Sequence, residues 1–80
     1  MWIKTSFDTL IEANGCVVKK VHWQPKERAI ALIWGGTNKT DTIGFGPTEV
    51  IERLWLSLET ALAGDIHYWD FNEALALATP

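Results

Sequence analysis

The residues best suited to chemistry lie near the end of the chain, where His67, Asp70 and Glu73 recur at intervals of three. Imidazole and carboxylate groups bind metals and act as general acids and bases. On one helix, three residues at this spacing turn through about 120° from first to last, so only two can share an ion. Asp70 and Glu73 also match a capping box, which starts a helix. We therefore predict no catalytic residue, no metal site and no cofactor.

Two other candidate sites lack the partners that their chemistry needs. Gly35-Gly36 and Gly44-Phe45-Gly46 are not followed by the Gly-Lys-Ser/Thr of a phosphate loop. Cys16 is six residues from His22, about 20 Å along an extended strand, which is too far for a base to activate a thiol. The sequence indicates a protein without catalysis.

Tryptophan is unusually frequent, with five in 80 residues. A domain of this size buries only about 60–65% of its unfolded surface, and each indole carries an N–H that needs a partner. Some tryptophans should therefore lie at the surface, where aromatic residues concentrate in interfaces. The residues that we assign to an interaction surface are Trp23, Trp34, Tyr68, Trp69 and Leu77.

Charge is divided unevenly along the chain. The first 40 residues carry six basic and three acidic side chains, whereas the last 40 carry one basic and seven acidic. Such a dipole can steer association or favour pairing of opposite faces. Basic side chains gather around one expected hairpin: Lys19, Lys20, Lys26 and Arg28. They suggest an alternative function, a nucleic-acid-associated module, although the sequence pI of about 5.2 argues against it.

Composition indicates one globular domain over residues 1–80, with 48% hydrophobic and 21% charged residues. A single cysteine fits a reducing compartment, and the first 20 residues lack the pattern of a signal peptide. No apolar run reaches the ~20 residues of a membrane span. We expect a cytoplasmic protein, with no membrane partner, and its small size favours a prokaryotic or phage source.

Local patterns at the start of the chain predict a strand over Met1–Thr5 and then a short helix from Ser6 to Asn14. Ser6 suits a helix cap, and Phe7, Leu10 and Ile11 fall on one helical face. The alternative is that Asn14-Gly15 forms a hairpin turn between two strands.

Three short runs then predict an antiparallel meander over Cys16–Trp23, Arg28–Trp34 and Asp41–Phe45. Pro25 marks the first turn, and residues 35–40 form the second loop. Alternation places Val17, Lys19, Val21 and Trp23 on one side, and Asp41, Ile43 and Phe45 on one side of the third strand.

Helical spacing from Val50 to Leu62 predicts a long helix, with Pro47 at its first position and Gly64 after its end. Residues 66–69 are ambiguous between helix, strand and loop. Asp70 begins a second short helix whose apolar stripe is Phe71, Leu75 and Ala78, with Leu77 off that stripe.

These elements make an α+β fold: a small antiparallel sheet of three or four strands, with one long and one or two short helices packed on one face. The second strand of the meander is apolar on both sides, with Ala29, Ala31 and Ile33 on one and Ile30, Leu32 and Trp34 on the other. One side therefore lacks a cover, and a second copy can supply it. We expect a homodimer or a complex with a protein partner, with Trp23 or Trp34 near the seam.

Overall fold

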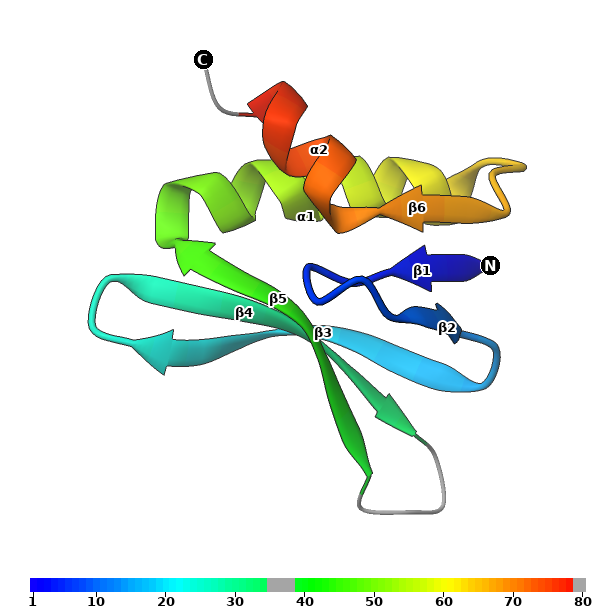
Figure 1. Ribbon diagram of the computed structural model, residues 1–80, viewed down its shortest axis with the longest axis horizontal. Helices are drawn as coiled ribbons and strands as arrows, with labels where there is room; N and C mark the ends of the chain where they lie inside the picture. Colours follow the sequence, from blue (N-terminus) through cyan, green and yellow to red (C-terminus); the bar gives the residue numbers. More distant parts are fainter. Residues whose placement is uncertain (35–38, 79–80) are drawn as a thin grey trace.

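The computed structural model describes residues 1–34 and 39–78, which form two three-stranded sheets and two helices (Figure 1). The α+β class is confirmed, but two sheets replace the single expected one. The elements are β1 (Trp2–Lys4), β2 (Leu10–Glu12), β3 (Cys16–Gln24), β4 (Glu27–Trp34), β5 (Thr40–Pro47), α1 (Thr48–Ala63), β6 (Tyr68–Asp70) and α2 (Phe71–Ala78).

The small sheet has the order β2-β1-β6 and joins distant parts of the chain. β1 and β2 are antiparallel, whereas β1 and β6 are parallel, with Ile3 opposite Trp69. The segment 66–69 therefore ends in a strand, which the sequence left ambiguous. Parallel pairing needs a long crossover, and here it is the whole meander together with α1 (Figure 1).

The predicted helix from Ser6 to Asn14 is wrong. Thr5 is buried, and its hydroxyl accepts hydrogen bonds from the backbone N–H groups of Phe7 and Thr9. Asp8 takes a left-handed conformation with φ of 65°, which closes a tight turn between β1 and β2. A side chain that satisfies nearby backbone groups competes with the helix in this way.

The turn at Asn14-Gly15 matches the alternative reading in part. Gly15 has φ of +78°, in the region that glycine adopts without steric cost. Strands do lie on either side, but β2 and β3 belong to different sheets. The turn therefore passes the chain from one sheet to the other.

The larger sheet is the predicted antiparallel meander, in the order β3-β4-β5. Its register shifts once between His22 and Gln24 on β3, and once on β5 next to Ile43. The second shift separates Ile43, which is buried, from Phe45, which is exposed. The prediction that these two side chains share a side is therefore wrong, because a bulge inserts one unpaired residue. The expected loop lies partly at 35–38, outside the described residues.

Both helices pack on the inner side of the sheets (Figure 1). Pro47 is the N-cap residue of α1 rather than its first helical residue, and Gly64 follows the end of the helix. The ring of Phe71 lies over Gly44, where an added Cβ would stand 2.5 Å from Cζ. The core contains Ile3, Ile30, Leu32, Ile43, Ile51, Leu54, Leu58, Ala61, Trp69, Phe71 and Ala74.

Candidate interaction surfaces

The meander sheet has an inner face against the helices and an outer face that neither of the described helices, α1 and α2, covers. Ile30 and Leu32 point inward to the core, so their neighbours Ala29 and Ala31 point outward. Residues paired directly across strands share a face, and the register sets Val21 and Phe45 on either side of Ala29. The outer face is therefore largely apolar, as the two-sided pattern of β4 predicted.

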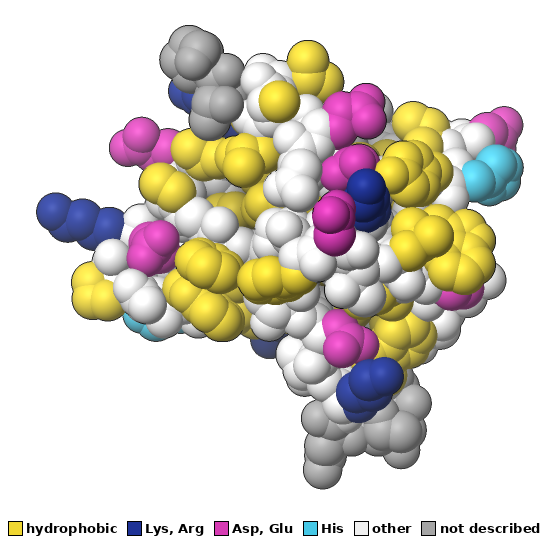
Figure 2. Space-filling view, viewed as in Figure 1, with side chains coloured by type: hydrophobic (Ala, Val, Ile, Leu, Met, Phe, Trp, Pro, Cys, Tyr) yellow, Lys and Arg dark blue, Asp and Glu magenta, His cyan; other side chains and the backbone are white. Residues whose placement is uncertain are grey.

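Three aromatic side chains form the outer-face cluster, which we define as Phe7, Trp23 and Phe45. The rings of Trp23 and Phe45 stack with centroids 4.9 Å apart, and Phe7 lies 6.4 Å from Phe45. The side chain of Phe7 is 59% exposed, that of Trp23 is 40% exposed and that of Phe45 is 43% exposed. Figure 2 shows hydrophobic side chains gathered over β5 and the adjoining β1–β2 turn. The cluster leaves stacked aromatic surface exposed to solvent.

The floor of this face is made of small side chains. Ala29 and Ala31 are 0% and 1% exposed although no helix covers them. The larger side chains of Val21 and Phe45 lie in register on either side of Ala29. The result is a shallow apolar surface with an aromatic border.

The predicted interaction residues occupy different places. Trp23 is in the outer-face cluster, whereas Trp34 packs against the core and donates from Nε1 to Asp41 at 2.8 Å. Trp69 is 6% exposed and donates to the Ser57 hydroxyl at 3.1 Å. Leu77 is 84% exposed on α2.

Tyr68 is exposed on the small sheet, where it is directly opposite Trp2 in the parallel register. Sequence reasoning did not place Trp2 beside Tyr68, because nothing in the local sequence indicates that β1 pairs with β6. It also missed Phe7 and Phe45, which were assigned to a helix face and to the same side of a strand as Ile43. The turn at Thr5 and the bulge at Ile43 bring them to the outer face, and neither carries a signal that alternation reveals.

The four basic residues do not form one patch. Lys20 and Arg28 lie on the inner side and approach Glu52 of α1 at 2.8 Å and 3.9 Å. This hydrogen bond and charge from Lys20 lower the pKa of Glu52 below its ordinary value. Lys19 lies on the outer face, opposite Ala31, and Lys26 occupies the β3–β4 turn with φ of 66°. A nucleic-acid groove needs its cations on one surface.

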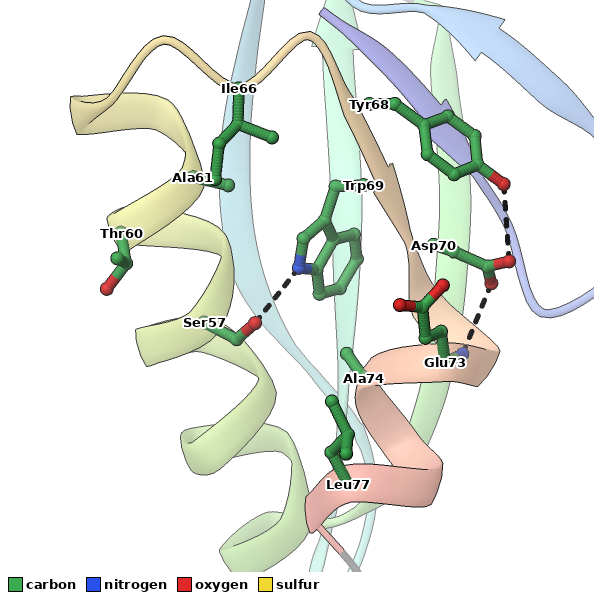
Figure 3. Close-up of a pocket in the computed structure, with 10 residues that line it drawn as sticks. All are labelled: Ser57, Thr60, Ala61, Ile66, Tyr68, Trp69, Asp70, Glu73, Ala74 and Leu77. Carbon is green, nitrogen blue, oxygen red and sulfur yellow. Dashed lines mark hydrogen bonds between the residues drawn. The ribbon is translucent and has the colours of Figure 1, made fainter.

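A hollow of about 340 Å³ lies between α1, α2 and β6 (Figure 3). Trp69 forms its floor, with Ile66 at one end and Leu77 at the other. Asp70 and Glu73 stand on its rim. The Asp70 carboxylate accepts from the backbone N–H groups of Asn72 and Glu73, which confirms the predicted cap of α2.

The rim of the hollow carries the carboxylates of Asp70 and Glu73, with Lys4 opposite Asp70 in the parallel register. Tyr68 donates its hydroxyl to Asp70 at 3.3 Å. Loss of hydration and the nearby carboxylates of Asp70 and Glu73 raise the pKa of Tyr68, because each opposes the phenolate. The hollow thus combines an apolar interior with negative charge at its mouth.

The side chains that the sequence suggested for metal binding or catalysis are not brought together. Among residues 1–34 and 39–78, no three His, Cys, Asp or Glu side chains are arranged to hold a metal ion. His67 is exposed, and its carbonyl accepts from Trp2 N–H. Cys16 donates from Sγ to the Ala13 carbonyl at 2.9 Å, and burial raises the pKa of its thiol. Of the described helices, neither is long and apolar enough to cross a membrane.

Comparison with known proteins gives no relative on which to base a function: no family model, curated protein or solved structure matches the chain.

Proposed function

We propose that this protein is a small non-catalytic interaction protein that self-associates as a homodimer through the outer face of the meander sheet. The observation that supports it best is the stacked pair of Trp23 and Phe45 on a face whose floor is apolar. Aromatic residues are enriched in interface cores, where they supply contact area at little entropic cost. A second copy covers this face with the same surface, as a two-fold interface requires.

The charges on the outer face support a two-fold arrangement. Glu27, Ala29 and Ala31 alternate along β4 on one side, and Lys19 lies opposite Ala31. Lys19 and Glu27 therefore lie on either side of Ala29. A two-fold axis near Ala29 sets Lys19 of one copy against Glu27 of the other, which pairs opposite charges twice.

The size of the face predicts a weak dimer. Strands of eight or nine residues, spaced about 4.8 Å apart, give a flat area on the order of 400 Å² per protomer. Stable interfaces bury about 800 Å² per partner. We therefore expect a dimer that dissociates on dilution, with a Kd on the order of micromolar or weaker.

The nucleic-acid alternative has less support. Two of its four cations already approach Glu52 at the inner side of the sheet, and phosphate affinity depends on the number of available cations. The outer face offers more apolar surface than charge.

The proposal is tested by sedimentation velocity from about 1 μM to 1 mM protein. We expect the mass of the wild type to rise from monomer toward dimer, and Trp23→Glu to remain monomeric over the whole range. Leu56→Glu is the matched control, because it adds the same charge at an exposed leucine on α1. Circular dichroism checks that each variant is folded.

Charge exchange gives a second, independent reading. Lys19→Glu and Glu27→Lys should each weaken the dimer, and the double variant should restore it. A wild type that is monomeric at 1 mM, or a Trp23→Glu variant that dimerises normally, would exclude this interface.

A further inference from the structure

The hollow between α1 and α2 lies away from the outer-face cluster and is not used by the proposed dimer. We propose that it binds the side chain of one lysine or arginine presented by a partner polypeptide. The hollow's volume of about 340 Å³ is at the lower end of the ~300–1,000 Å³ typical of ligand sites, which suits one extended side chain better than a larger ligand.

The lining matches the two parts of such a side chain. Trp69, Ile66 and Leu77 offer apolar surface along the length of the hollow (Figure 3). Lysine and arginine bury an aliphatic stem along apolar surface while their charged end stays near water. The apolar length therefore suits the stem, and the rim receives the cation.

The rim carries the carboxylates of Asp70 and Glu73, and Lys4 of β1, opposite Asp70 in the parallel register, offsets part of the charge of Asp70. Glu73 turns toward Trp69 and Asp70 in Figure 3, and within the described part of the chain no lysine or arginine lines the hollow. An ammonium or guanidinium group between Asp70 and Glu73 forms charge-assisted hydrogen bonds, which are stronger than neutral ones. The aromatic face of Tyr68 adds attraction for a cation within about 6 Å.

The same geometry disfavours other occupants. An anion meets two carboxylates, and the N–H groups of Asn72 and Glu73 at the start of α2 already bond to Asp70. A divalent metal requires more oxygen ligands than two carboxylates supply, and it gains nothing from the apolar floor. A basic side chain uses both the floor and the rim.

The test is a titration followed by ¹⁵N NMR, with the indole N–H of Trp69 as the reporter at the floor. The probes are capped tripeptides, Ac-Ala-X-Ala-amide, in which X is lysine, arginine, norleucine or glutamate. Norleucine keeps the aliphatic stem of lysine without its charge. We expect the lysine and arginine peptides to shift the Trp69 signal saturably, the norleucine peptide to bind about fivefold more weakly, and the glutamate peptide to give no shift.

Variants separate the rim from the floor. Glu73→Gln should weaken the lysine peptide about fivefold and leave the norleucine peptide unchanged. Leu77→Ala should weaken both, because it removes stem contact. Glu59→Gln is the matched control, an exposed carboxylate on α1 outside the hollow, and should change neither.

Three results would overturn the assignment. The first is equal binding of the lysine and norleucine peptides, and the second is no shift of Trp69 with any peptide. The third is a Trp69 shift that follows protein concentration without peptide, which would assign the hollow to a second copy. The dimer is tested separately, by sedimentation of the Trp23→Glu variant. A negative result for the hollow is therefore distinguishable from a negative result for the dimer interface.

Discussion

The two faces of the meander sheet bury the same strand by different means. On the inner face, Ile30 and Leu32 of β4 lie in the core with the helices over them. On the outer face, Ala29 and Ala31 are equally buried, although neither α1 nor α2 lies over them, and Ala29 has Val21 and Phe45 as its register partners. Full burial of a residue therefore does not show that a second layer covers it. On the outer face, a small side chain such as alanine can be shielded from solvent without a helix over it.

The difference also affects polar groups. Inward-facing Lys20 and Arg28 find a carboxylate, Glu52, on the helix above them. Outward-facing Lys19 has no such layer opposite it, and the aromatic rings of the outer-face cluster stack on one another. The inner face is covered by helices of the same chain, whereas aromatic side chains of the outer face remain exposed.

The largest expected effect comes from removing inner-face volume. Leu58→Ala deletes a fully buried side chain of α1 and should lower the free energy of unfolding by about 2–5 kcal/mol. Val17→Ala, at an exposed position of the outer face, should change it by less than about 1 kcal/mol in the monomer. Urea denaturation at low protein concentration measures both. Equal losses would contradict the division between the faces.

The next effect comes from adding volume to the inner face. Gly44→Ala forces a methyl group against the Phe71 ring and should destabilise the protein by about 1–3 kcal/mol. Gly46→Ala is the control on the same strand, because its nearest neighbour would be Ile51 at 3.9 Å, an ordinary contact. Thermal melting should show a lower Tm for Gly44→Ala only.

A smaller effect concerns pH. The pKa of Glu52 is lowered by its hydrogen bond to Lys20, so its contribution to stability is present above the unfolded pKa of about 4.3. The contribution is lost as pH falls through the lowered pKa of the folded state. Glu52→Gln should therefore be less stable than the wild type at pH 7, and the gap should shrink below about pH 5. A gap that stays constant down to pH 2 would show that the ion pair does not contribute.

The smallest effect is a difference in thiol reactivity between the faces. Burial raises the pKa of Cys16, so less reactive thiolate is present near neutral pH. A thiol placed at the exposed Val17 position, in a Val17→Cys/Cys16→Ala variant, should react with iodoacetamide several-fold faster at pH 8. The rate of alkylation, followed by mass spectrometry, measures this. Faster reaction at Cys16 would reverse the expected order.

Sequence reasoning succeeded where structure is local. The alternation in β3 and β4, the turn at Pro25 and the helical spacing of α1 each depend on neighbouring residues, and each is confirmed. It failed at Ser6–Asn14, where the same apolar residues suit a helix or a strand and the Thr5 hydroxyl favours the turn.

Non-local features were beyond the reach of local patterns. The pairing of β1 with β6 depends on residues at opposite ends of the described chain. The hollow also combines side chains of α1, β6 and α2, so no single segment indicates it. Both Trp23 and Trp69 were assigned to an interaction surface; Trp23 is exposed, whereas Trp69 is buried because β6 turns it inward.

The parallel pairing of β1 with β6 has a consequence for synthesis of the protein. A ribosome makes chains from the N-terminal end at about 5–20 residues per second. The meander and α1 can associate before β6 is made, since their contacts are among β3, β4, β5 and α1 themselves. β1, made at the beginning, has no β6 beside it until residues 68–70 have left the exit tunnel. The small sheet is therefore completed last: while Tyr68 is still inside the tunnel, β1 is paired with β2 on one edge only.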